Sequence, residues 1–258
     1  MLASSVAAAP ASQQITSLPG LPAAEFAKLT PQYSGYVTVD QTAGRALFYW
    51  FATAQTSKPT EAPLIVWLQG GPGCSSLIGL LTEHGPVRMA AAGSSADLEI
   101  NGWSWSRLAN VLYIEAPAGV GFSYSNTSSD YNTNNELTAQ DNYVFLQNWS
   151  LLFPEFSNSP LWLTGESYAG GLLLFLIFSP HFFPSFSPPH FSSFVPSFFY
   201  FFFFWTDYVP QLARQIIQGS DASLNQRLSG LMIGYVASPP LYFFFFLFHS
   251  LFWFSIDV

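Results

Sequence analysis

The run GESYAG at residues 165–170 is the part of this 258-residue chain whose residue types and spacing most directly suggest chemistry. It follows residues 161–164, an apolar run that predicts a strand, so we expect Ser167 on a sharp strand-to-helix turn. In such a turn only small residues two positions before and after the serine avoid collision, and Gly165 and Ala169 are small. The pattern predicts a serine nucleophile, with a simple Ser/Gly turn as the alternative.

A glycine-rich run, WLQGGPGCSS at residues 67–76, follows another predicted strand at residues 63–68. Its backbone N–H groups can face the end of the sheet. There α/β-hydrolases place half of an oxyanion hole, and the residue after the nucleophile supplies the other half. A phosphate-binding loop is a poor alternative, because no lysine lies near these glycines. Occurring in this order, the two motifs support each other.

Further elements must hold these loops at one edge of a sheet, and the sequence predicts them. Apolar runs predict strands at residues 111–114 and 228–233, and helical spacing predicts helices at residues 135–153 and 208–217. Asp207 is a candidate N-cap for the second helix. Alternating strands and helices indicate the α/β class, with a mainly parallel sheet covered by helices.

The composition excludes several classes of function. The chain is 50% hydrophobic and has a formal net charge of −8, so it is neither wholly disordered nor suited to bind nucleic acid or anionic lipid. Its length can bury a core without a metal or disulfide scaffold. Because Cys74 is the single cysteine, this chain alone cannot build a disulfide framework or a cysteine-rich zinc site, and no cofactor is expected.

Two stretches, residues 171–205 and 236–256, carry no charged side chain and consist mainly of Phe, Ser, Pro and Leu. Prolines interrupt the first, and His249 and Ser250 break the second, so neither supplies the ~20 apolar residues of a membrane span. Because pyrimidine-rich codons encode this mixture, we interpret both stretches as translated non-coding sequence, such as a retained intron. The alternative, a genuine insertion, would need a partner surface to cover 13 phenylalanines in the first stretch.

Three long runs together resemble the serine carboxypeptidase family, whose plant members are called serine carboxypeptidase-like proteins. They are WLQGGPGCSS, NVLYIEAPAGVGFSYS at residues 110–125, and GESYAG, with WSWS at residues 103–106 as a further match. The resemblance covers residues 29–170 and resumes at residues 208–213 and 228–234. It implies the N-terminal part of an α/β-hydrolase fold, a mainly parallel sheet flanked by helices.

The resemblance also divides the chain into segments. Residues 1–28 form an N-terminal segment, a candidate remnant of a signal peptide. The α/β-hydrolase domain then occupies residues 29–170 and 207–235, interrupted by a Phe-rich low-complexity insertion at 171–206 and followed by an aberrant Phe-rich C-terminus at 236–258. In the family, GESYAG runs through one residue into YVPQLA. The separation of these two runs here supports the intron interpretation independently of composition.

Site roles follow from the same resemblance. Ser167 is implied to be the acyl-forming nucleophile, and the N–H groups of Gly71 and Tyr168 are implied to form the oxyanion hole. The residues implied to bind the C-terminal carboxylate of a peptide are Gln69, Gly70 and Glu166. Most relatives have Asn where this chain has Gln69, so the amide lies one methylene further out.

Glu83 resembles a carboxyl that pairs with Glu166. Two carboxyls that share a proton raise one pKa, which would let one of them donate to the substrate carboxylate at acidic pH. A solvated surface carboxylate is the alternative interpretation of Glu83.

A serine nucleophile also needs a histidine base oriented by a carboxylate, and in this fold both follow the serine in chain order. The histidines and acids after Ser167 lie in nothing similar to the family's Asp or His motifs; they are His181, His190, His249, Asp207, Asp221 and Asp257. His84 precedes the serine and is expected to be a loop residue rather than the base. The resemblance therefore implies a serine-type carboxypeptidase whose triad Asp and His are not in this chain, nor is the disulfide partner of Cys74. We expect this chain alone to be inactive.

Two other functions stay open: an acyltransferase on the same scaffold that uses a sugar ester as donor, and a non-catalytic or membrane-associated truncated protein. The expected partners are peptide or protein C-termini, without nucleic acid or membrane. The family implies the secretory pathway and an extracellular or vacuolar destination, and residues 126–128 and 148–150 match glycosylation sequons. Residues 1–11 do not form a clear signal peptide, because no basic residue precedes their short apolar run.

Overall fold

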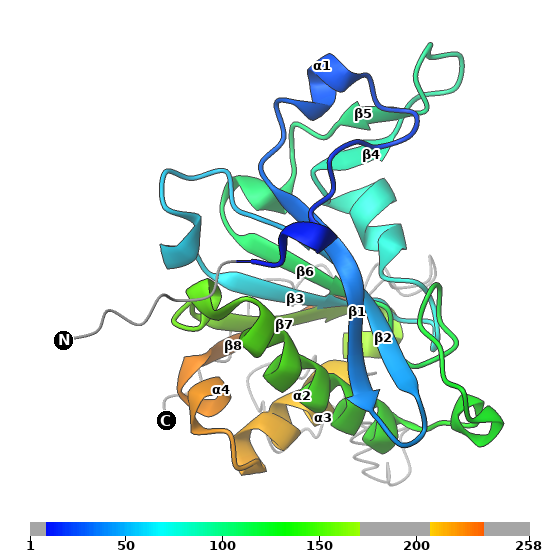
Figure 1. Cartoon of the computed structure of the whole chain (residues 1–258), viewed down its shortest axis with the longest axis vertical. Coiled ribbons are helices and arrows are strands. Elements are labelled where there is room, and N and C mark those ends of the chain that lie inside the picture. Colours follow the sequence, from blue (N-terminus) through cyan, green and yellow to red (C-terminus); the bar gives the residue numbers. More distant parts are fainter. Residues whose placement is uncertain (1–8, 171–206, 235–258) are drawn as a thin grey trace, which may run out of the picture.

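The computed structural model describes residues 9–170 and 207–234, which fold around a six-stranded sheet (Figure 1). The strands lie in the order β1-β2-β6-β3-β7-β8. β3 pairs in parallel with β6 and β7, and β7 with β8, whereas β2 pairs antiparallel with β1 and β6. The bounds are β1 Gln32–Asp40, β2 Arg45–Ala52, β3 Leu64–Leu68, β6 Asn110–Ile114, β7 Leu161–Glu166 and β8 Leu228–Gly234, and a separate small sheet pairs β4 Val87–Met89 with β5 Leu98–Ile100.

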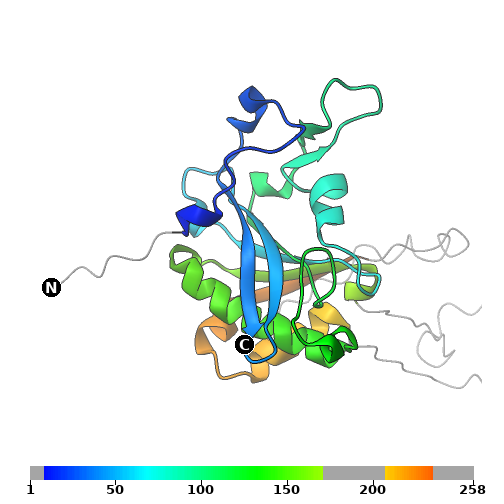
Figure 2. The same ribbon diagram turned by 45° about the vertical axis from the view of Figure 1, so that its right-hand side comes forward.

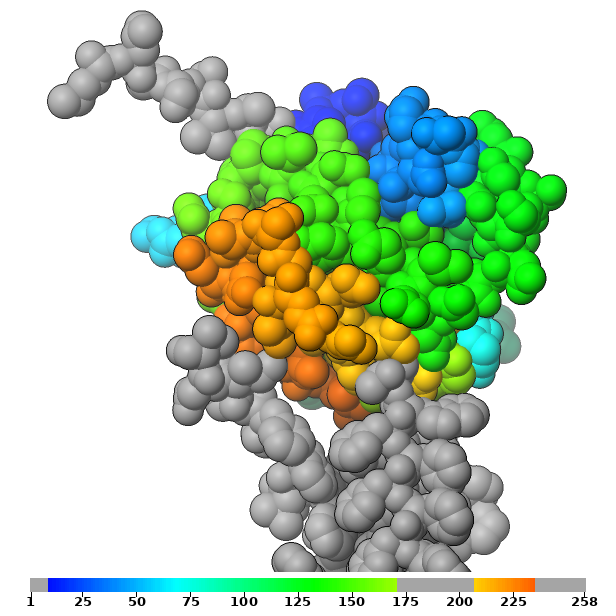
Figure 3. Space-filling model, turned by 90° about the horizontal axis from the view of Figure 1, so that it is seen from below, coloured from blue at the N-terminus to red at the C-terminus, as the bar shows by residue number. Residues whose placement is uncertain are grey.

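Three helices lie together on one side of the six-stranded sheet (Figures 1 and 2): α2 Asn135–Leu152, α3 Tyr208–Gln218 and α4 Ala222–Arg227. α2 and α3 pack against each other, and Figure 3 shows the gold and orange surface of residues 207–234 beside the green surface of α2. The remaining helical segments are short: α1 Ala23–Phe26, η1 Ala11–Gln13, η2 Pro59–Glu61, η3 Gly79–Glu83, η4 Trp105–Arg107, η5 Ser128–Tyr131, η6 Pro154–Phe156 and η7 Ser167–Gly170.

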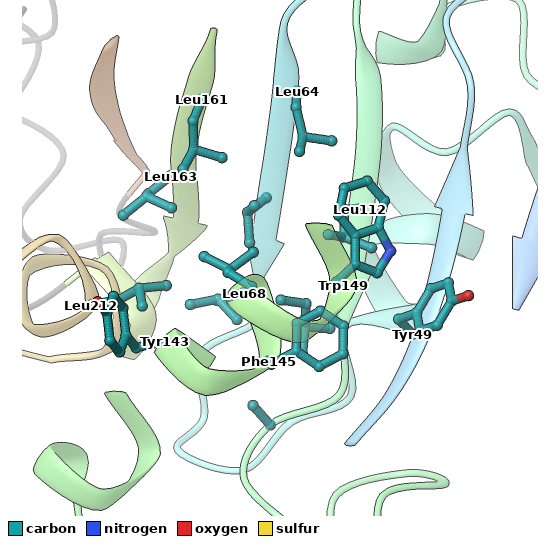
Figure 4. Close-up of a cluster of buried hydrophobic side chains, with 14 of the residues drawn as sticks. Tyr49, Leu64, Leu68, Leu112, Tyr143, Phe145, Trp149, Leu161, Leu163 and Leu212 are labelled. Atoms are coloured by element: carbon teal, nitrogen blue, oxygen red, sulfur yellow. The ribbon is translucent and has the colours of Figure 1, made fainter. Parts of the chain in front are cut away.

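The core lies on both faces of the sheet, because every residue of β3 and β6 is buried. Alternate residues of a strand point to opposite faces, so Leu64 and Leu68 join the cluster under α2, while Trp67 belongs to a second cluster. Figure 4 shows the first cluster, in which Phe145 and Trp149 of α2 lie among leucines of the strands. The Trp149 ring meets the ring of Phe51 in β2 edge to face, with centroids 5.0 Å apart, so aromatic packing fixes the helix on the sheet.

The four strands and two helices predicted from apolar runs are confirmed, with bounds that differ by at most two residues. The sequence did not predict the β1–β2 hairpin. Asp207 occupies the N-cap position of α3, as predicted, but its side chain accepts no hydrogen bond from the first turn of the helix. Its Oδ1 instead accepts a hydrogen bond from Asn135 Nδ2 at 2.7 Å, which ties α3 to the start of α2.

Residues 1–8, 171–206 and 235–258 lie outside the described residues. Both Phe-rich stretches fall in these ranges, so the structure does not test their interpretation as translated non-coding sequence. Within the described ranges, no helix combines the length and the apolar composition that a membrane crossing requires. β7 and β8, which flank residues 171–206 in the chain, pair in parallel in the one sheet. Residues 207–234 therefore complete the same sheet as residues 9–170.

Trp149→Ala should lower the free energy of unfolding by about 3–5 kcal/mol, because it removes a side chain that is 1% exposed and packed among rings. Urea denaturation followed by circular dichroism measures the change. Leu151→Ala is the matched control on the same helix: Leu151 is 77% exposed, so its replacement should change stability by no more than about 0.5 kcal/mol. Equal effects of the two substitutions would contradict the assignment of α2 to the core.

Candidate active site

Ser167 lies on the turn where β7 ends and η7 begins, as the sequence predicts. Its φ is 54°, and it is the only non-glycine residue in the described part of the chain with a positive φ. A Cβ at Gly165 would lie 2.7 Å from the Leu68 carbonyl oxygen and 2.9 Å from the Ala169 Cβ, so only glycine fits there. The left-handed conformation costs ~1–2 kcal/mol, which the close packing around the turn sustains.

The glycine-rich loop after β3 packs directly on this turn. A Cβ at Gly70 would lie 2.7 Å from the Glu166 carbonyl oxygen and 2.8 Å from the Tyr168 backbone nitrogen. Gly71 has a φ of 112°, which other residues rarely adopt. The structure thus brings the backbone of Gly71 and Tyr168, the two residues expected to form an oxyanion hole, to adjoining segments beside Ser167.

Two serines anchor the far end of the glycine-rich loop. Ser76 Oγ donates to the Ile114 carbonyl at 2.6 Å and accepts from the Gln69 N–H at 3.2 Å, so it bridges the ends of β3 and β6. Ser75 Oγ donates to the carboxylate of Glu115, which is fully buried. Hydrogen bonds of this kind to a buried carboxylate are among the stronger ones in proteins.

Glu115 in turn depends on the loop that follows β6. Its second carboxylate oxygen accepts from the Phe122 N–H at 2.7 Å, and a Cβ at Gly121 would lie 1.4 Å from that oxygen. The sequence run at residues 110–125 contains these residues, but their role in holding the glycine-rich loop was not predicted. A buried acid followed by glycine-rich sequence is the signal that could have indicated it.

A chain of polar side chains runs along the sheet edge next to Ser167. Trp67 Nε1 donates to Gln69 Oε1 at 2.9 Å, and Gln69 Nε2 donates to Glu166 Oε1 at 2.6 Å. Gln69 is 7% exposed. Burial raises the pKa of Glu83, the charge of Glu166 raises it further, and a hydrogen bond with the Gln69 side chain opposes the rise. The structure therefore brings Gln69, Glu83 and Glu166 together, and it adds Trp67, which sequence reasoning missed.

His84 is a buried residue of the aromatic cluster under this edge. Its ring stacks on Trp105 at a centroid distance of 4.0 Å, and its Nδ1 lies 3.0 Å from the Tyr113 hydroxyl. Burial lowers the pKa of His84 to about 4, so the ring is neutral at pH 7. These contacts agree with the expectation that His84 is not the base. Cys74, in the glycine-rich loop, is exposed and has a free thiol.

A pocket of about 710 Å³ opens beside the turn. Tyr168 and Tyr208 line it together with Gly73 and Asn135. The Tyr168 hydroxyl donates to Asn135 Oδ1 at 3.0 Å, and the Gly73 N–H donates to the Tyr208 hydroxyl at 3.3 Å. The pocket therefore lies between the glycine-rich loop, the serine turn and the helices α2 and α3. It is large enough for an amino-acid side chain. Across residues 9–170 and 207–234, no group of three or more His, Cys, Asp or Glu side chains is placed to hold a metal ion.

A mainly parallel sheet that carries a strained serine after one strand and a glycine-rich loop after its neighbour defines the N-terminal part of an α/β-hydrolase fold. A sequence profile of the serine carboxypeptidase family (peptidase S10) matches residues 20–176. The chain belongs to this family, and the resemblance stated from its motifs is confirmed.

Individual relatives agree with this assignment. Serine carboxypeptidase-like 46 of Arabidopsis thaliana is 53% identical over 159 residues, which are 61% of this chain and 32% of that protein. Serine carboxypeptidase-like 25 of the same plant is 41% identical over 224 residues, 86% of this chain and 38% of that protein. The crystal structure of Kex1(Δ)p, a prohormone-processing carboxypeptidase from Saccharomyces cerevisiae, matches with a TM-score of 0.62 and 25% identity, covering 90% of this chain and 44% of Kex1(Δ)p. The chain spans about a third of the length of these plant relatives.

Ser167→Gly should be more stable to urea than Ser167→Ala by about 1 kcal/mol. Glycine adopts a φ of 54° without the steric cost that any Cβ carries there, and this gain exceeds its greater loss of chain entropy. Both variants lack the hydroxyl, so the comparison isolates the backbone. Equal stabilities would show that the turn is not strained at this residue.

The stability of the protein should depend on His84 between about pH 6.5 and pH 4. In that interval the unfolded chain binds a proton on this histidine and the folded chain does not, so the free energy of unfolding falls as the pH falls. The loss is at most about 3 kcal/mol. Urea denaturation of wild type and His84→Gln at several pH values measures this loss. The difference between their free energies of unfolding should shrink toward pH 4. A difference independent of pH would contradict the buried neutral histidine.

Proposed function

We propose that this chain carries the nucleophile-bearing part of a serine-type carboxypeptidase site. Ser167 Oγ gives its proton to a base that this chain does not supply as it bonds to the carbonyl carbon before the last residue of a peptide. The C–N bond then breaks, and the released amine takes up that proton. Water then hydrolyses the ester on Ser167. The N–H groups of Gly71 and Tyr168 stabilise the oxyanion of both steps. The observation that carries the proposal is the positive φ of Ser167 on a turn against which the glycine-rich loop packs.

The end of the peptide is held, in this proposal, at the cluster of Gln69, Gly70, Glu83 and Glu166. The raised pKa of Glu83 supports the pairing of two carboxyls around one proton, which favours activity at acidic pH. The neighbouring pocket lined by Tyr168 and Tyr208 accommodates a substrate side chain.

The triad Asp and His are, in this proposal, not in this chain. Of the acids after Ser167, Asp207 is bonded to Asn135, and Asp221 accepts from the Leu224 N–H at 3.0 Å to cap α4. Both are thus used in the structure of the helices, while His181, His190 and His249 lie outside the described residues. Neither these histidines nor Asp257 stands in sequence similar to the family's Asp or His motifs, so on this proposal the chain alone does not turn over substrate. We further propose that residues 171–206 and 236–258 are translated intron sequence and that the complete protein enters the secretory pathway, for an extracellular or vacuolar destination.

Two measurements test the proposal together. The first sequences mature transcripts across the codons for Gly170 to Tyr208 and beyond Gly234, and the second assays release of phenylalanine from N-benzoylglycyl-L-phenylalanine. We expect no release by this chain above its Ser167→Ala variant. A spliced product with downstream Asp and His motifs should release phenylalanine and lose at least about 1000-fold in kcat on Ser167→Ala.

Other outcomes contradict separate parts of the proposal. Turnover by this chain itself, lost in Ser167→Ala, would show that the base is present in it. Turnover that survives Ser167→Ala would overturn the nucleophile assignment. Phe-rich codons that persist in all mature transcripts would overturn the intron interpretation.

A further inference from the structure

The part of the chain that precedes β1 packs against the sheet. Gln14 forms an isolated antiparallel bridge with Tyr33 of β1. The Gln13 side chain accepts a hydrogen bond from the hydroxyl of Tyr49, a buried residue of β2. Ala9, further toward the N-terminus, packs against the main hydrophobic cluster. Contacts with the folded domain therefore position the backbone nitrogen of Ala9.

This nitrogen meets a carboxylate. The Ala9 N–H donates at 2.9 Å to Oε1 of Glu155, in the short helix η6 that follows α2. The other oxygen, Glu155 Oε2, is buried, and no group within residues 9–170 and 207–234 forms a hydrogen bond with it. Burial raises the pKa of Tyr33, and the charge of Glu155 raises it further. One oxygen of this carboxylate is therefore out of water and unsatisfied, which is costly.

No lysine or arginine neutralises Glu155. All seven of these basic residues lie in the described part of the chain, and each has another partner. The pairs are Lys28 with Glu25, Arg45 with Asp130 and Asp141, Lys58 with Glu61, Arg88 with Glu99, Arg107 with the Gly102 carbonyl, Arg214 with Gln218, and Arg227 with the Ser159 carbonyl. A partly buried carboxylate needs an opposite charge or further donors, and Glu155 has one backbone N–H.

A free α-amino group at Ala9 supplies both the charge and the donors. When the Ala8–Ala9 peptide bond is hydrolysed, its C–N bond breaks, and water adds its hydroxyl to the Ala8 carbonyl carbon and a proton to the Ala9 nitrogen. The new carboxyl group then loses a proton and the new amine gains one. An α-amino group has an ordinary pKa of about 7.7–8.0, so it is an ammonium group at acidic pH. Its three N–H donors can serve Oε1 and Oε2 of Glu155 together.

The sequence around this bond suits cleavage. The run SVAAAP at residues 5–10 places small side chains on both sides of the bond. Small residues of this A-x-A-like kind mark the sites where leaders of secreted proteins are removed. The cleavage site is thus present, although no basic residue precedes it.

We propose that the bond between Ala8 and Ala9 is a processing site for an endopeptidase that cuts after small residues, and that Glu155 binds the ammonium group of the new N-terminus. The resulting ion pair holds residues 9–15 on β1 and η6. The cut itself rests on the secretory route of the proposed function, because that is where such endopeptidases act. The ion pair does not depend on that route or on catalysis.

An engineered cut tests the ion pair, starting from the full chain. In this parent chain the recognition sequence of a specific protease replaces residues 3–8, so that cleavage frees the Ala9 amine. Urea denaturation at pH 6 gives the equilibrium constant of unfolding before and after the cut. We expect the cut to lower this constant about tenfold, the effect of a hydrogen bond that gains a charged donor.

Two substitutions in the parent chain serve as controls. Glu155→Gln keeps the shape and an acceptor oxygen but removes the charge, so the cut should change its unfolding constant less than twofold. Glu136→Gln makes the same change at an exposed acid of α2 and should keep the full effect of the cut. An effect below twofold in the parent chain would overturn the ion pair, and this comparison needs no substitution at Glu155. Equal effects in the parent chain and in Glu155→Gln would also overturn it.

Mass spectrometry of the N-terminal peptide tests the processing. The full chain, expressed in plant cells and purified, should begin at Ala9. Protein recovered from secretory compartments with any other N-terminus would overturn the processing site alone. Protein that keeps Met1 and is absent from those compartments would overturn both the processing site and the secretory route of the proposed function.

Discussion

The site depends on one close approach, that of the loop after β3 to the turn after β7. The approach is closer than any Cβ allows, because the position of a Cβ on Gly70 is already occupied by the backbone of Glu166 and Tyr168. β3 and β7 are adjacent and parallel, so both loops leave the sheet at the same edge and in the same direction. Pairing of these two strands, together with glycine at two positions, is therefore sufficient to place a strained serine next to a pair of backbone segments rich in N–H groups.

Burial controls the charge of the polar groups around this edge. It raises the pKa of Glu83 and lowers the pKa of His84, its neighbour in the chain, so the same physical cause favours the neutral form of an acid and of a base. The effect concentrates polar groups without concentrating charge. Gln69 fits this environment because its neutral amide donates a hydrogen bond to Glu166 without adding charge.

Much of the fold was predictable from short-range patterns, and the remainder depends on contacts between distant residues. β3 and β6 are continuous apolar runs because both faces of the sheet are covered, and GESYAG marks the turn by its own spacing. The β1–β2 hairpin escaped prediction because β1 is only partly buried and its side chains do not alternate cleanly between apolar and polar. The roles of Trp67 and Glu115 were not predicted. Their hydrogen bonds with Gln69 and Ser75 form only when the strands are aligned in the sheet.

The pairing of the strands and the contacts of the loops explain how the proposed site around Ser167 is held in place. β7 is paired on both sides, with β3 and with β8, so the turn at Ser167 is held from two directions. The glycine-rich loop is held by Ser75 and Ser76 through Glu115 and the end of β6, all of which precede Ser167 in the chain. None of these supports requires the histidine base. Ser167, the backbone of Gly71 and Tyr168, and the side chains of Gln69, Glu83 and Glu166 therefore lie in one preorganised unit, which is the arrangement that the proposed nucleophile, oxyanion hole and substrate-binding cluster require.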